Sequence, residues 1–140
     1  MIILDTSVLI KWYVSEKEED VDKALKLLEK HVRNEEQIAV PTYALYEFAQ
    51  TLIRKRKFMI SQFRRVIKHL YKNTLKVIRT SSALIVVSAQ IATAYNVEIY
   101  DAIFMAAAKK LSCELITADE KCYKTTKNLS YIKLLRDYTV

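Results

Sequence analysis

Four carboxylates stand in otherwise apolar stretches of this 140-residue sequence, whereas most of its sixteen acidic residues lie in charged runs such as 16–20 and 35–36. The four are Asp5, Glu47, Asp101 and Asp119. Like charges brought into one site repel each other unless a cation is present. Oxygen ligands without His or Cys favour Mg²⁺ or Mn²⁺, and two such ions about 3.5–4 Å apart serve in-line hydrolysis of phosphodiesters.

Each of these acids also has an ordinary structural role open to it. Asp5, Asp101 and Asp119 stand where helices are predicted to begin, and Asp is a preferred helix cap. Glu47 shares a helical stripe with Thr51, which suits a solvated side chain. Joint placement favours a site: Asp5 and Asp119 come directly off predicted strands, and the helices carrying the other two can face the same edge.

The predicted elements alternate between short apolar strands and helices. We expect strands at residues 2–4, 38–40, 75–78, 114–117 and 131–135. Helices are expected at 5–13, 16–33, 41–53, 61–71, 81–95 and 101–111, with a short one from 119. Strands that are apolar on both sides and separated by helices are typical of a parallel sheet covered on both faces. The prediction is a single domain over 1–140, a three-layer α/β/α sandwich with a five-stranded parallel sheet.

Basic residues are concentrated in one part of the chain. The net charge is +7, and residues 48–97 contain no Asp or Glu. The same stretch carries ten Lys and Arg, among them Arg54, Arg56 and Arg64. Such a segment favours contact with a polyanion backbone, and these three arginines are our candidates for binding a nucleic acid such as RNA.

Composition excludes several kinds of site. With no glycine, the chain has neither a P-loop nor a dinucleotide-binding loop, because both need glycine for close backbone approach. The two cysteines, Cys113 and Cys122, have no metal-ligand spacing and are expected to be reduced thiols. Polar residues interrupt the longest apolar stretch, 83–97, so we expect no membrane span and a cytoplasmic protein.

The order and context of the four acids resemble the PIN-domain ribonucleases, and most closely the small VapC-type toxins of toxin–antitoxin pairs. Ile3-Leu4-Asp5-Thr6-Ser7 is similar to the first acidic motif of that family, and 41–47 to the segment carrying its glutamate. Tyr100-Asp101-Ala102-Ile103 and Thr117-Ala118-Asp119-Glu120-Lys121 are similar to its third and fourth motifs. The resemblance covers nearly the whole chain.

The resemblance implies a metal-dependent endoribonuclease that cleaves single-stranded or loop RNA. Asp5, Glu47, Asp101 and Asp119 would be both the catalytic residues and the ligands of Mg²⁺ or Mn²⁺. Ser7 and Thr117 fall where the family supplies hydroxyls that hold carboxylates or water. The implied partners are an RNA substrate, a small antitoxin protein and a second copy of the chain in a homodimer.

Three alternatives stay open from the sequence. One is an RNA-processing or quality-control PIN nuclease without an antitoxin, which would have the same four acids. Another is a catalytically silent RNA- or protein-binding module, against which a complete acid set argues because mutually repelling groups cost stability. The third is an aspartyl-nucleophile phosphatase, which usually needs a second Asp two residues after the first, where this chain has Ser7.

Overall fold

A computed structural model describes residues 1–73 and 75–140, and its centre is a parallel sheet of five strands. The strands are β1 (Ile2–Leu4), β2 (Ile38–Pro41), β3 (Lys76–Ile78), β4 (Glu114–Thr117) and β5 (Ile132–Leu134). Their order across the sheet is β3-β2-β1-β4-β5, with every neighbouring pair parallel. The predicted five-stranded parallel α/β fold is confirmed.

The central strands are buried on both faces. All residues of β1 and β2 are buried, as are three of the four in β4. This is why the sequence shows continuous apolar runs there instead of alternation. The carboxyl ends of parallel strands lie at one edge of the sheet, so the residues that follow β1 and β4 come out side by side.

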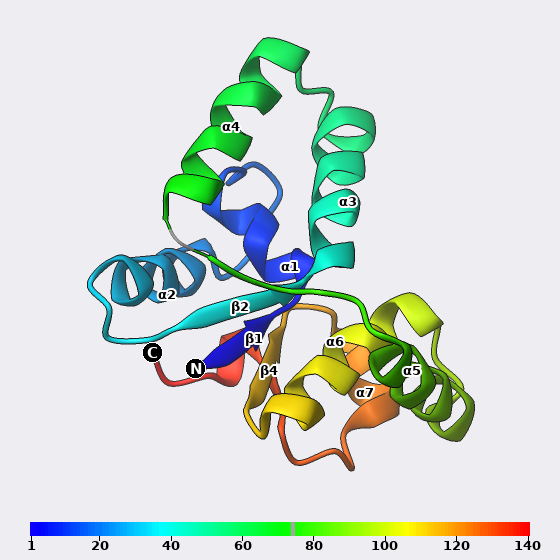
Figure 1. Cartoon of the computed structure of the whole chain (residues 1–140). Helices are drawn as coiled ribbons and strands as arrows, with labels where there is room; N and C mark the ends of the chain where they lie inside the picture. Colours follow the sequence, from blue (N-terminus) through cyan, green and yellow to red (C-terminus); the bar gives the residue numbers. More distant parts are fainter. Residues whose placement is uncertain (74) are drawn as a thin grey trace.

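Helices cover the sheet from both sides (Figure 1). They are α1 (Thr6–Leu9), α2 (Val21–Val32), α3 (Thr42–Gln50), α4 (Ile60–Lys72), α5 (Ser82–Tyr95), α6 (Ile99–Leu111) and α7 (Glu120–Thr126). Figure 1 views the sheet nearly edge-on, with α1, α3 and α4 above it and α5 and α6 below. Helix α6 packs closely against β1, β2 and β4, because Ala102 and Ala106–Ala108 are fully buried and small.

Three predicted helix boundaries were wrong. The helix predicted over 16–33 begins only at Val21, because Lys17 and Asp20 adopt positive φ angles of 58° and 53° that an α-helix cannot contain. Pro41 ends β2 instead of opening the next helix. Helix α6 begins at Ile99, so Asp101 lies inside its first turn and is not its cap.

In the described part of the chain, no single helix is long and apolar enough to cross a membrane. The pair α5 and α6 reaches that length and composition only together, and it is bent by 116°. Both cysteines are free thiols, as expected.

Candidate active site

Asp5 is held in place at the end of the central strand. It is the N-cap of α1, where its Oδ1 accepts a hydrogen bond from the Ser7 amide at 3.2 Å. Its Oδ2 accepts a hydrogen bond from the Thr117 hydroxyl at the end of β4. The carboxylate therefore bridges two neighbouring strand ends.

Asp119 joins the same network from the other strand. The Thr117 hydroxyl accepts from the Asp119 amide at 3.0 Å, and the Ser7 hydroxyl accepts from the Ala118 amide at 3.0 Å. Asp119 itself caps α7 through a 2.9 Å hydrogen bond from the Cys122 amide. Both predicted hydroxyls thus lie beside the acids: Thr117 holds a carboxylate, whereas Ser7 fixes the backbone between β4 and α7.

Glu47 and Asp101 approach from helices on either side. Glu47 lies in α3, and its Oε2 atom is buried without a hydrogen-bond partner among the described residues. Asp101 lies in the first turn of α6 and is half-buried. In the described structure none of the four acids forms an ion pair, although seven salt bridges occur elsewhere.

The electrostatics of the site follow from this crowding. Burial raises the pKa of Asp5 despite its hydrogen bonds to Thr117 and Ser7. Burial and the neighbouring charges of Asp5 and Asp101 raise the pKa of Glu47. The pKa of Asp101 rises to about 6, first through burial and then through the charges of Asp5, Asp119 and Glu98. All three shifts arise first from burial, and the mutual repulsion of the acids adds to them.

One cleft contains all four acids. Its volume is about 540 Å³, and it is lined by Asp5, Glu47, Asp101 and Asp119 together with the basic residues Lys11, Lys17, Lys55 and Arg56. Basic residues around the cleft can attract a polyanion, and the acids inside it can hold the metal ion that such a polyanion would contact.

Sequence reasoning missed one feature of the cleft wall. The sequence predicts a solvated Glu18 within a charged run, but its side chain is half-buried and lies in the cleft wall. It pairs with the buried Lys11 at 2.6 Å and with Arg56. Lys11 lies in η1 (Ile10–Trp12), and Arg56 directly follows η2 (Thr51–Lys55), a turn of π-helix. Because both partners lie outside the charged run that contains Glu18, the local pattern around Glu18 does not predict these ion pairs.

The donor set fits a hard divalent cation. It consists of four carboxylates that form no ion pair with any described residue, and among those residues the buried Glu47 Oε2 atom has no hydrogen-bond partner. As the side chains stand, no three of the described His, Cys, Asp or Glu residues are arranged to hold one metal ion. Mg²⁺ does not require that, because it usually keeps several waters and binds one or two carboxylates directly.

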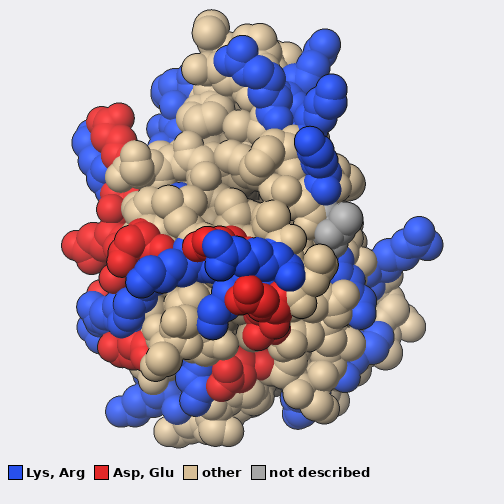
Figure 2. All heavy atoms as spheres, turned by 90° about the vertical axis from the view of Figure 1, so that its left-hand side faces the viewer, with Lys and Arg blue, Asp and Glu red and all other residues tan. Residues whose placement is uncertain are grey.

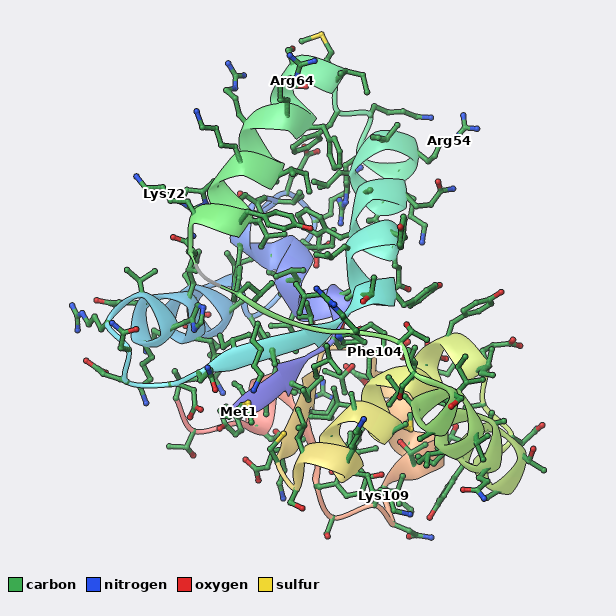
Figure 3. All side chains as sticks on the ribbon, in the orientation of Figure 1. Met1, Arg54, Arg64, Lys72, Phe104 and Lys109 are labelled. Atoms are coloured by element: carbon green, nitrogen blue, oxygen red, sulfur yellow. The ribbon has the colours of Figure 1, made fainter. Side chains whose placement is uncertain are left out.

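The three predicted RNA-binding arginines do not share one surface. Arg56 lines the acidic cleft, and the exposed Arg54 lines an adjoining groove beside Glu47. Arg64 lies on α4 near the tip of the molecule (Figure 3). The tip, where η2 (Thr51–Lys55) lies beside the start of α4, shows Lys and Arg but no Asp or Glu in Figure 2. The acid-free segment therefore gives a basic tip, of which only part adjoins the cleft.

Comparison with known structures finds the same fold in toxin–antitoxin proteins. A toxin–antitoxin complex from Klebsiella pneumoniae superimposes with a TM-score of 0.71 at 20% identity, covering 100% of both chains. VapC20 of Mycobacterium tuberculosis, a sarcin–ricin-loop-cleaving toxin, gives 0.64 at 13% identity, covering 89% of this chain and 94% of that one. VapBC2 from Rickettsia felis bound to a promoter DNA fragment gives 0.66 at 18%, covering 96% and 97%.

No curated protein matches this sequence significantly. The family model for the PIN domain, however, matches residues 2–128, which include all four acids and every strand except β5. The chain therefore belongs to the PIN-domain family.

Proposed function

We propose that this chain is a metal-dependent endoribonuclease and the toxin of a VapBC-type toxin–antitoxin pair. The observation that carries the proposal is the single cleft in which Asp5, Glu47, Asp101 and Asp119 meet without a cationic partner among the described residues. Membership of a family whose members are generally nucleases supports it. The substrate is single-stranded or loop RNA.

The residues of the cleft divide the work between them. The four carboxylates would hold Mg²⁺ or Mn²⁺, and the bound ion would supply a more acidic water and positive charge at the scissile phosphate. Thr117 and Ser7 keep Asp5 and the turn before Asp119 in register. Lys55, exposed on the wall of the cleft, draws the phosphate backbone towards the acids.

The toxin assignment is supported by the fold of the neighbours. The Klebsiella pneumoniae structure is a toxin–antitoxin complex, and the Mycobacterium tuberculosis protein is an RNA-loop-cleaving toxin. We further propose that the chain acts in the cytoplasm as a homodimer. A small antitoxin covers the cleft and places an Arg among the carboxylates, where bidentate contacts replace the charge of the metal.

The nuclease is tested by cleavage of total cellular RNA with Mg²⁺, with Mn²⁺ and with EDTA, mapped by end sequencing. Asp5→Asn keeps the helix cap, since Asn caps as well as Asp, but removes a metal-binding charge. We expect its cleavage rate to fall roughly a hundredfold or more. Asp137→Asn, at an exposed acid far along the chain, is the matched control and should cleave normally. A folded Asp5→Asn protein that cleaves at the wild-type rate would refute the site.

The toxin role has its own test, because an RNA-processing PIN nuclease would have the same acids. Expression of the active chain alone should arrest growth, and co-expression of the small protein encoded beside it should relieve the arrest. The purified complex of the two should be silent as a nuclease. Normal growth of cells that contain active chain would favour the processing enzyme instead.

A further inference from the structure

A second pocket lies beside the acidic cleft and is of opposite character. Its volume is about 310 Å³, within the range of roughly 300–1,000 Å³ typical of small-ligand sites. Three tyrosines, Tyr43, Tyr46 and Tyr100, form much of its wall, and Ile85, Ile99 and Ile103 complete its apolar lining. It lies between the start of α3, α5 and the start of α6.

The aromatic rings are arranged for stacking. Tyr43 and Tyr100 stack with ring centroids 5.0 Å apart and planes 17° from parallel. Tyr43 also packs edge to face against the buried Phe104, with their ring centroids 6.4 Å apart. Figure 3 labels Phe104 where the start of α3 meets α6. Tyr46 is 72% exposed and Tyr100 56%, so these rings offer apolar surface to solvent on a rigid base.

The tyrosines are tied to the acids by helix geometry. Tyr43 lies one turn before Glu47 on α3, and Tyr100 directly precedes Asp101 on α6. Any molecule bound at the carboxylates therefore has the aromatic pocket as its neighbour.

A basic groove joins the two pockets. This groove, of about 620 Å³, shares Tyr43 and Tyr46 with the aromatic pocket and Glu47, Thr51 and Lys55 with the acidic cleft. Arg54 and Lys55 stand exposed on its wall, and in the described part of the chain neither forms an ion pair. The surface thus runs from carboxylates through cations to stacked aromatic rings.

We propose that the pocket of Tyr43, Tyr46 and Tyr100 binds one unstacked base of the RNA next to the scissile phosphate. This rests on the proposed nuclease function and adds the part of the substrate that the acids do not contact. The phosphate lies at the carboxylates, the backbone follows Arg54 and Lys55, and the base stacks on Tyr100. Stacking on aromatic side chains is how proteins hold bases of single-stranded RNA, and a base-paired helix cannot present one. The pocket thereby selects single strands and loops.

Binding of short RNAs tests the base site. All proteins carry Asp5→Asn so that fluorescein-labelled single-stranded hexanucleotides stay intact. Tyr100→Leu, which removes the ring but keeps apolar bulk, should weaken binding by about 5- to 150-fold, the worth of one stacked base. Tyr100→Phe should bind normally because it keeps the ring face. Tyr71→Leu on α4, with a similarly exposed tyrosine at 61%, is the matched control and should also bind normally.

A set of hexanucleotides with one abasic residue at each position in turn locates the contact. For one abasic position, the affinity for the protein with Tyr100 should be as low as the affinity of intact RNA for Tyr100→Leu. The affinity of this abasic RNA for Tyr100→Leu should be no lower still. Equal RNA affinity of Tyr100→Leu and Tyr71→Leu would overturn the base site. So would a Tyr100→Leu protein that binds every abasic RNA more weakly than the protein with Tyr100 does, by the same factor as for intact RNA.

The same proteins distinguish a base site from a subunit interface. If Tyr100→Leu converts a dimer to monomers in sedimentation while RNA affinity is unchanged, the pocket is an interface between copies of the chain and the base site is wrong. Absence of cleavage by the wild-type chain would refute the nuclease proposal, whereas this binding assay would still report on the pocket by itself.

Discussion

At the scale of single residues, the acids combine two roles that are often treated as alternatives. Asp5 and Asp119 do cap α1 and α7, each with one carboxylate oxygen on a backbone amide. A carboxylate has two oxygens and several lone pairs, so capping leaves acceptor capacity for a cation. The cap fixes the side chain, and the fixed side chain is what a metal site requires.

Asp101 differs from both, because it caps nothing. Replacing it by Asn removes one of the repelling charges, so Asp101→Asn should melt a few degrees above wild type in EDTA. The same change removes a proposed metal ligand, so the rise in melting temperature produced by Mg²⁺ should shrink. Calorimetry of both proteins in EDTA and in Mg²⁺ measures the two effects. Equal melting in EDTA and equal responses to Mg²⁺ would show that Asp101 is outside the acidic site.

The raised pKa of Asp101 predicts a pH dependence with a definite sign. Its pKa is about 6 in the folded protein against 3.8 ordinarily, so the folded state holds this proton more tightly than the unfolded chain. Without metal, the free energy of unfolding should therefore fall as the pH rises from about 4 through about 6. Mg²⁺ competes with that proton, so its stabilising effect should disappear as the pH falls through 6. Urea unfolding across this range checks both slopes, and Asp101→Asn should flatten the first.

At the scale of elements, the turns and helix ends of this chain form without glycine. In residues 1–73 and 75–140, six non-glycine residues have positive φ, including Asn96 after α5 and Ser112 after α6, both in the left-handed conformation. Asn adopts this conformation readily, but for most residues the Cβ atom makes it unfavourable. The backbone at Ser112 is therefore more strained than the backbone at Asn96.

This contrast predicts the effect of adding glycine. Ser112→Gly should raise the free energy of unfolding by about 0.5–1 kcal/mol, because relief of the left-handed strain exceeds the added freedom of the unfolded chain. Asn96→Gly should change it little. Thermal unfolding of the two variants tests the difference, and a destabilised Ser112→Gly would contradict the strain argument.

Local patterns predicted the strands and the environment of the acids, because burial on both faces and helix periodicity are properties of neighbouring residues. All five strands lie within a residue of their predicted bounds. Contacts between distant residues left no such signature. The pairing of Glu18 with Lys11 and Arg56 depends on how the segment before α2 folds back, and the stacking of Tyr43 on Tyr100 depends on how α3 meets α6.

At the scale of the whole molecule, a positive protein surrounds a negative cleft. The net charge is +7, yet burial and mutual repulsion raise the pKa values of Asp5, Glu47 and Asp101. On the proposed function, RNA would be attracted to the body of the protein, and its final approach would depend on a cation among the acids.

The salt dependence of RNA affinity measures the attraction. Log affinity should fall with log salt at about −0.7 per phosphate contact, and replacing Arg54, Arg56 and Arg64 by Gln should flatten that slope. The matched control removes three charges elsewhere: Lys109→Gln, Lys110→Gln and Lys124→Gln, of which the first two lie at the far end of α6. Fluorescence titration from low to high salt compares the variants. Equal slopes in both triple variants would show that the predicted arginines face away from RNA.

The hydrogen bond between Thr117 and Asp5 joins residues 112 positions apart, and Asp119 follows still later. During synthesis on the ribosome, β1 emerges first but gains its neighbour β4 only after most of the chain has been translated. A nascent chain that ends before residue 119 lacks the fourth carboxylate and the strand that holds the first. Translation at roughly 5–20 residues per second thus separates the synthesis of Asp5 from that of Asp119 by about 6–23 s. On the proposed function, a nascent chain would therefore gain cleavage activity only after residue 119 has left the ribosome.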